Sequence, residues 1–180
     1  SRGLGDVYKR QRYWAKYFSD PQYVRVNGKP LVVIFDSGVN SITDEQVKIM
    51  RETAKKLGFK DGLAVACCRG TRSAFDIATR YNVNTLYSGD SRELPYSDIV
   101  NATKSTWKGS PEQPFIPTIT CGWDKRPWEG KGPDGLGNTP VGGYYTEDTP
   151  EAFGSLLSDA IKWMDENPEK TTRERIALIY

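Results

Sequence analysis

The chain has 180 residues, of which 37% are hydrophobic and 27% are charged, and its formal net charge is +2. This length and composition describe one globular domain, or a piece of a larger domain. No apolar run is long enough to cross a membrane, and the sequence contains no secretory signal. We therefore expect no membrane span in these residues.

The chain contains no histidine and three cysteines, Cys67, Cys68 and Cys121. Without histidine, neither a Ser-His-Asp triad nor a His-ligated metal centre can form within these residues. The odd number and irregular spacing of the cysteines fit neither a disulfide framework nor a zinc site. We expect Cys67 and Cys68 to be small core side chains.

Residues 1–11 show no apolar periodicity, and Asp6–Gln11 resembles the translated end of a transposon used to prepare sequencing libraries. We therefore expect residues 1–11 to be a non-native remnant and residues 12–180 to form the domain. The first segment holds three basic residues and one acidic residue, so the remainder is neutral. A neutral chain gives no evidence for a nucleic-acid partner, and we expect none.

The first elements are a helix and a hairpin. The spacing of Trp14, Tyr17 and Phe18 predicts the end of an amphipathic helix. Asn27-Gly28 is typical of the tight type I′ turn of a hairpin. The apolar run Leu31–Phe35 then predicts a strand that is covered on both faces, as in a parallel sheet.

The next elements alternate between helix and strand. Thr43 and Gln46 form the capping-box pattern that starts a helix. The apolar run Leu63–Cys68 predicts a second buried strand. A polar helix is expected over residues 73–81, and a short strand over residues 85–87.

The second half of the chain continues this alternation. We expect a helix over Tyr96–Trp107, a strand over Phe115–Thr120 and a long Gly- and Pro-rich loop over Gly130–Glu147. Thr149-Pro150 is a strong helix start, with proline at the first helical position. A last strand is expected over Arg175–Tyr180.

About five strands that alternate with helices predict parallel βαβ units. The units could belong to an open doubly wound sheet or to part of a (β/α)₈ barrel. Ligands of both architectures bind at the carboxyl ends of the strands. Five residues fall at such ends: Asp36, Arg69, Asp90, Trp123 and Asp124. No Gly-rich phosphate-binding motif follows any strand, which argues against a nucleotide-binding fold.

The densest candidate site follows Gly122. There the chain places Trp123, Asp124, Arg126 and Trp128 within six residues. Aromatic faces can stack on the C–H face of a sugar ring, and Asp and Arg form charge-assisted hydrogen bonds with its hydroxyls. In the alternative interpretation, the tryptophans seal the end of a core while Asp124 and Arg126 form a surface ion pair.

Three further residues are candidates for ligand contacts. Asp36 follows a buried strand and would accept sugar hydroxyls, or it would cap the next loop through an Asx-turn. Tyr144 and Tyr145 would form the wall of a sugar subsite, or they would belong to a solvated loop.

Two segments, Asp20–Asp36 and Ile116–Trp128, resemble the endo-α-mannosidase type of glycoside hydrolase (family 99) and bacterial family 71/99-like proteins. The likeness extends loosely over Arg12–Tyr180. It implies a partial (β/α)₈ barrel that is truncated at both ends. It further implies a hydrolase that cleaves glycosidic bonds of an oligo- or polysaccharide, α-mannosides among them, without a metal cofactor. The parent protein would be secreted, periplasmic or attached to the cell surface.

The resemblance implies that the catalytic carboxylates follow the last strand, in an Asn-Glu-aromatic-x-Glu motif beyond Tyr180. One carboxyl group would act as an acid and the other would assist the attack. We therefore expect no catalytic residue in this chain, and an inactive fragment. The substrate contacts that it implies are Asp36, Trp123, Asp124, Arg126 and Trp128.

Two other functions are compatible with the sequence. The first is a non-catalytic carbohydrate-binding or polysaccharide-assembly protein on the same fold, because a fold does not determine a function. The second is an open-sheet signalling or nucleotide domain, which would bind no sugar.

Overall fold

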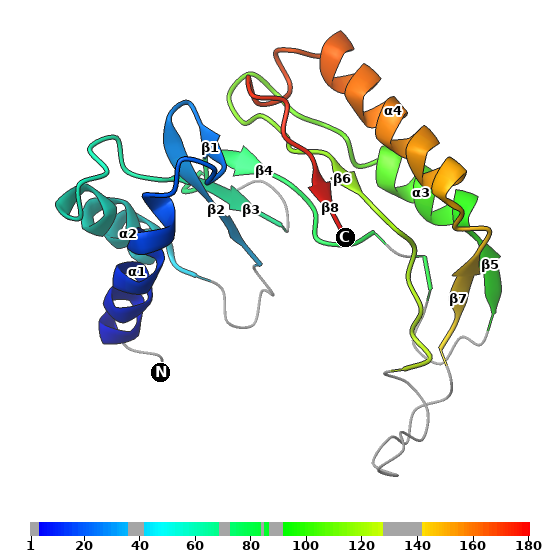
Figure 1. Cartoon of the computed structure of the whole chain (residues 1–180), viewed down its shortest axis with the longest axis horizontal. Coiled ribbons are helices and arrows are strands. Elements are labelled where there is room, and N and C mark those ends of the chain that lie inside the picture. Colours follow the sequence, from blue (N-terminus) through cyan, green and yellow to red (C-terminus); the bar gives the residue numbers. More distant parts are fainter. Residues whose placement is uncertain (1–3, 36–41, 69–72, 84, 87–91, 128–141) are drawn as a thin grey trace. The chain divides into compact units, whose positions relative to one another are not determined.

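The computed structural model describes residues 4–35, 42–68, 73–83, 85–86, 92–127 and 142–180 (Figure 1). These residues form a mixed α/β fold with four helices and eight short strands. The chain divides into two units. Unit 1 comprises Ser1–Thr79, Gly109–Ile116 and Pro168–Arg175, and unit 2 comprises Arg80–Lys108, Pro117–Asn167 and Ile176–Tyr180.

Unit 1 begins with helix α1 (Leu4–Phe18), which ends where the sequence predicted. Phe18 is buried, and the partly buried Trp14 packs against the same core cluster. The helix starts within residues 1–11. The presence of a helix there does not test whether residues 1–11 are a non-native remnant, which stays a prediction.

The predicted hairpin is confirmed. Strands β1 (Arg25–Val26) and β2 (Lys29–Ile34) pair in antiparallel fashion. Between them, Asn27 has φ 50° and Gly28 has φ 77°. A type I′ turn requires positive φ at both of these central residues, which explains the Asn-Gly pair.

Helix α2 (Asp44–Lys56) starts at the predicted capping box. The Gln46 amide donates to Thr43 Oγ1 at 3.2 Å, and the Thr43 amide donates to Gln46 Oε1 at 2.8 Å. Its buried Val47 and Met50 join the core cluster of unit 1. Figure 1 shows α1 and α2 side by side in this unit.

The sheet of unit 1 is parallel apart from β1. Strand β3 (Ala64–Cys67), buried along its whole length, lies between β2 and β4 (Ile77–Ala78). Single parallel bridges then add Phe115 beside Ala78 and Thr171 beside Phe115. The order of these segments across the sheet is therefore their order along the chain.

The predicted helix over residues 73–81 is wrong, because β4 lies there instead. Ile77, Ala78 and Thr79 are all buried, and Thr79 Oγ1 donates to the Ile116 carbonyl at 2.8 Å. An extended backbone can pair with β3 on one side and with Phe115 on the other, which a helix cannot do. The strand expected over 85–87 is absent at residues 85 and 86, and residue 87 lies outside the described part.

Unit 2 contains two parallel strand pairs. Strand β6 (Thr118–Ile119) pairs with β8 (Leu178–Ile179). The two strands lie within the strands predicted over residues 115–120 and 175–180. Strand β5 (Glu93–Pro95) pairs with β7 (Tyr144–Thr146). The sequence did not predict this second pair, and β7 occupies part of the expected long loop.

Two helices complete unit 2. Helix α3 (Tyr96–Lys104) begins at the predicted residue, and α4 (Pro150–Glu166) begins after Thr149, whose hydroxyl caps it. Figure 1 shows the two helices side by side, and a 2.5 Å ion pair between Lys104 and Asp159 joins them.

Of the expected partial (β/α)₈ barrel, the structure confirms a mixed α/β fold with parallel strands. The described residues have parallel strands and helices, but they form no closed (β/α)₈ barrel. Among the helices described, none is long and apolar enough to cross a bilayer.

Candidate functional site

A pocket of about 650 Å³ opens in unit 2, just beyond the carboxyl end of β6. Two chain segments form it. Its lining residues are Cys121, Gly122, Trp123, Asp124, Arg126 and Pro127 from the first segment, and Tyr144, Tyr145, Thr146, Glu147 and Asp148 from the second. The predicted cluster after Gly122 thus forms one side of a cavity.

Backbone hydrogen bonds hold the two segments together. The Lys125 amide donates to the Gly143 carbonyl, and the Tyr145 amide donates to the Trp123 carbonyl, each at 3.2 Å. Between these bonds, Asp124 forms an antiparallel bridge with Tyr144. This pairing places the Asp124 and Tyr144 side chains next to each other.

The turn from β6 into the first segment contains a glycine because of its backbone angle. Gly122 has φ +98°, and its amide donates to Thr120 Oγ1 at 3.1 Å. A Cβ atom added at Gly122 would lie 3.1 Å from Asp148 Oδ2. The turn out of β6 and the close approach of Asp148 therefore both favour glycine.

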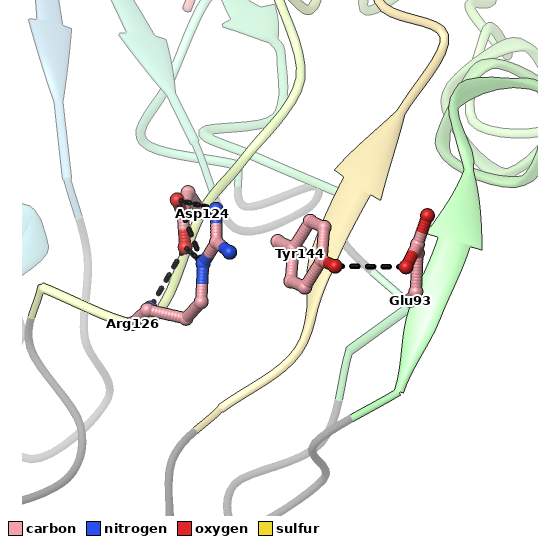
Figure 2. A network of polar contacts seen from close by, with 4 residues as sticks. All are labelled: Glu93, Asp124, Arg126 and Tyr144. Carbon is pink, nitrogen blue, oxygen red and sulfur yellow. Dashed lines mark hydrogen bonds and ion pairs between the residues drawn. The ribbon is translucent and has the colours of Figure 1, made fainter.

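Asp124 and Arg126 form an ion pair with several hydrogen bonds (Figure 2). Arg126 Nη2 lies 2.7 Å from Asp124 Oδ2, and Arg126 Nε lies 2.9 Å from Oδ1. The hydrogen bond from the Arg126 side chain lowers the pKa of Asp124, and the same bond raises the pKa of Arg126. The ion pair of the alternative interpretation is thus present, but it lines a pocket.

Tyr144 extends this pair into a longer chain of contacts (Figure 2). The Arg126 guanidinium carbon lies 3.6 Å from the centre of the Tyr144 ring, a cation–π distance. The Tyr144 hydroxyl donates to Glu93 Oε2 at 2.8 Å, which raises the pKa of Tyr144. Asp124 and Glu93 thus fix the two partners of the stack from opposite ends.

Two buried tyrosines form hydrogen bonds close to the pocket. The Tyr96 hydroxyl donates to the Thr120 carbonyl. Burial, with smaller effects from Cys121 and Asp148, raises the pKa of Tyr96 to about 12. The Tyr145 hydroxyl accepts a 2.5 Å hydrogen bond from the Thr85 amide. Both hydroxyls are therefore engaged in hydrogen bonds within the protein.

The structure brings together three of the five predicted contact residues, namely Trp123, Asp124 and Arg126. Asp36 and Trp128 lie outside the described residues. Tyr144 and Tyr145 also line the pocket, and their role as the wall of a sugar subsite stays a prediction.

Sequence reasoning missed three acidic residues of this site. Glu93 reaches it through the pairing of β5 with β7, and no local pattern indicates that pairing. Glu147 and Asp148 stand at the end of β7, which the sequence did not predict. The two acids just before the strong Thr149-Pro150 helix start were the one available signal.

The lining chemistry suits a sugar. Trp123 is half-buried and supplies an aromatic face, while the carboxylates of Glu147 and Asp148 are exposed and can accept hydroxyl hydrogen bonds. Within the described ranges, no group of three or more Cys, Asp or Glu residues is placed to hold a metal ion. The aromatic face and the exposed carboxylates support binding of a sugar through its ring face and its hydroxyls.

A family model described as Glycosyltransferase WbsX matches residues 3–179 of the chain. No curated protein and no solved structure matches the chain.

This match corrects the hydrolase prediction. It covers nearly the whole chain, whereas the resemblance to family 99 and 71/99-like hydrolases rested on two segments. Aromatic rings and carboxylates bind sugars in enzymes that cleave glycosidic bonds and in enzymes that form them, so these residue types did not distinguish the two reactions. The expected cleavage of α-mannosides is therefore wrong. The carboxylate pair expected beyond Tyr180 was implied by the hydrolase resemblance alone and lies outside this sequence. The alternative of polysaccharide assembly agrees better with the match.

Proposed function

The chain belongs to the WbsX glycosyltransferase family, and from that premise we propose that it takes part in transferring a sugar from an activated donor to a hydroxyl group of an oligo- or polysaccharide. The pocket beyond β6 holds a sugar of this reaction. Trp123, Asp124 and Arg126 are the proposed contact residues.

The observation that supports this proposal is the fixed geometry of the pocket wall. Arg126 is held in plane by Asp124 and is stacked on Tyr144, so its guanidinium needs no reorganisation when a ligand binds. Within the described residues its side-chain hydrogen bonds are made by Nε and Nη2, and we assign Nη1 to a sugar hydroxyl. The half-buried Trp123 adds an aromatic surface.

Transfer makes particular demands on such a pocket. A bond forms between an acceptor oxygen and the anomeric carbon, the donor's leaving group departs, and the acceptor hydroxyl loses its proton. A sugar hydroxyl must reach the anomeric carbon in place of water, so positioning of the sugar is a large part of the catalytic task. We assign the pocket this positioning role and name no catalytic acid or base.

The strand order supports the finer prediction that the fold is part of a (β/α)₈ barrel. In unit 1 the segments β2, β3, β4, Phe115 and Thr171 are neighbours in the order of the chain. A barrel has this sequential order, whereas a doubly wound sheet reverses its order at a switch point. A crystal structure of the whole protein that showed a reversal would contradict the prediction.

A binding experiment tests the proposed site. The protein is titrated with a panel of oligosaccharides by calorimetry, and the titration is repeated with Trp123→Ala. Loss of an aromatic surface is expected to weaken binding about tenfold. The matched control is Tyr13→Ala, which removes an exposed aromatic side chain on α1 and is expected to leave affinity unchanged. Equal affinity of the wild-type protein and Trp123→Ala would contradict the site.

A transfer assay tests the reaction. The protein is incubated with nucleotide-activated sugars and the best-bound oligosaccharide, and the products are weighed by mass spectrometry. We expect the acceptor to gain the mass of one sugar residue. Shortening of the oligosaccharide, with no extended product from any donor, would contradict a transferase.

A further inference from the structure

The charges around the pocket do not balance. Asp124 is neutralised by Arg126. Glu147 and Asp148 also line the pocket, are exposed, and have no ion-pair partner among the described residues. The lining residues thus contain three acids and one base, so the pocket has negative charge that its own cation does not offset.

Arg126 is the one cation among the described residues that line the pocket. Lys125 lies between Asp124 and Arg126 in the sequence, but it is not a lining residue, and its Nζ donates to the Leu86 carbonyl at 2.7 Å. Glu93, which holds Tyr144, adds a further negative charge behind the wall. By sequence alone, residues 128–141 contain one lysine and two acids.

The two acids of the pocket lining are each constrained locally, Glu147 by its backbone and Asp148 by its approach to Gly122. Glu147 has φ 64°, a left-handed conformation that residues with a long side chain seldom adopt. Asp148 approaches Gly122 so closely that a Cβ there would lie 3.1 Å from its Oδ2. Both residues line the pocket and are exposed.

From this charge pattern we propose that the pocket selects uncharged or amino sugars and rejects uronic acids and phosphate groups, through Glu147 and Asp148. The inference rests on the proposed function and names its substrate class. An activated donor that carries phosphate would meet like charge here. The pocket is therefore a site for the acceptor sugar.

Coulomb's law sets the size of the effect. At about 7 Å in water, one carboxylate changes the affinity for a unit charge by a factor of about 3, so two carboxylates together give about tenfold. The Debye length falls from about 10 Å at 0.1 M salt to about 3 Å at 1 M. The discrimination should therefore shrink to about twofold or less in concentrated salt.

The test uses methyl glycosides that differ in charge and share a ring. Methyl glucoside, methyl glucosaminide and methyl glucuronide are titrated by NMR at low salt, and the series is repeated with the galactose ring. The expected order of affinity is amino sugar, neutral sugar, uronic acid, with about a tenfold gap between the last two. A repeat in 1 M salt should close most of that gap.

The variant Glu147→Gln with Asp148→Asn should bring the three affinities to within about twofold of one another. The control Glu166→Gln changes an exposed acid near the end of α4 and should preserve the order. Uronic acids that bind as tightly as neutral sugars, or a gap that survives the double substitution, would overturn the charge selection while leaving sugar binding intact. Absence of binding by every sugar would overturn the proposed pocket function and this inference together.

Discussion

Tyr96 illustrates how single residues prepare the site without touching a ligand. Its side chain is buried, and its hydroxyl donates to the carbonyl of Thr120, two residues before Gly122. Glu93 works in the same indirect way, because its carboxylate holds Tyr144, on which Arg126 is stacked. Hydrogen bonds within the protein thus position the exposed side chains that line the pocket.

Tyr96→Phe should lower the free energy of unfolding by about 1 kcal/mol at neutral pH, because it leaves the Thr120 carbonyl without its donor. Denaturant unfolding followed by fluorescence measures this change. The exposed Tyr13→Phe serves as a control and should have little effect on the same measurement. A Tyr96→Phe protein as stable as wild type would show that the hydrogen bond contributes nothing.

The same residue predicts a pH dependence. The folded protein raises the pKa of Tyr96 to about 12, from 10.0 in the unfolded chain. The stabilisation is therefore complete below pH 10 and is lost as pH rises toward 12. Over this window the wild-type protein should lose about 2 kcal/mol more than Tyr96→Phe. Parallel stability curves for the two proteins would contradict the assignment.

At the scale of elements, two glycines have opposite effects on stability. One lies in the turn from β6 into the pocket, and the other lies within helix α4. Gly122 has φ +98° and faces Asp148, whereas Gly154 lies within α4 with open space where a Cβ would stand. One glycine is required by its backbone and its neighbour. The other lowers the stability of its helix.

Gly122→Ala should therefore destabilise the protein by about 1–2 kcal/mol and weaken sugar binding, since Asp148 must move. Gly154→Ala is the matched substitution and should stabilise the protein by about 0.5–1 kcal/mol with unchanged binding. Thermal unfolding and calorimetric titration measure the two effects. Effects of the same sign for both variants would contradict this explanation.

Local sequence signals predicted the elements that are decided locally. Asn27-Gly28 and the Thr43–Gln46 capping box each specify a structure through their own backbone angles and hydrogen bonds. Strand β4 is different, because only its pairing with β3 and with Phe115 makes residues 77–78 extended. A two-residue strand leaves no periodic pattern from which to predict it.

At the scale of the whole molecule, the three cysteines differ in their exposure to solvent. Cys67 and Cys68 are buried in unit 1, while Cys121 is exposed at the pocket. A thiol reagent added to the native protein should thus label one cysteine rapidly and the other two at the rate of unfolding. Mass spectrometry after timed labelling distinguishes the three sites. Bound sugar should slow the labelling of Cys121, because this thiol lines the pocket.

The site was predictable in part for a related reason. Trp123, Asp124 and Arg126 lie within four residues, so the sequence displays their cluster directly. Glu93 and Tyr144 meet only because β5 pairs with β7 across about fifty residues of chain. Sugar-binding side chains do not distinguish transfer from hydrolysis. The family match indicated that the reaction is a transfer.

The position of Thr171 beside Phe115 bears on how the protein is made. The Phe115 amide donates to the Lys170 carbonyl at 2.9 Å, so the sheet of unit 1 is completed by residues translated more than fifty positions later. Almost all of the intervening chain belongs to unit 2. On the ribosome, the edge at Phe115 stays open while those residues emerge. We expect chaperones that bind unpaired strands to act on the nascent chain in this interval.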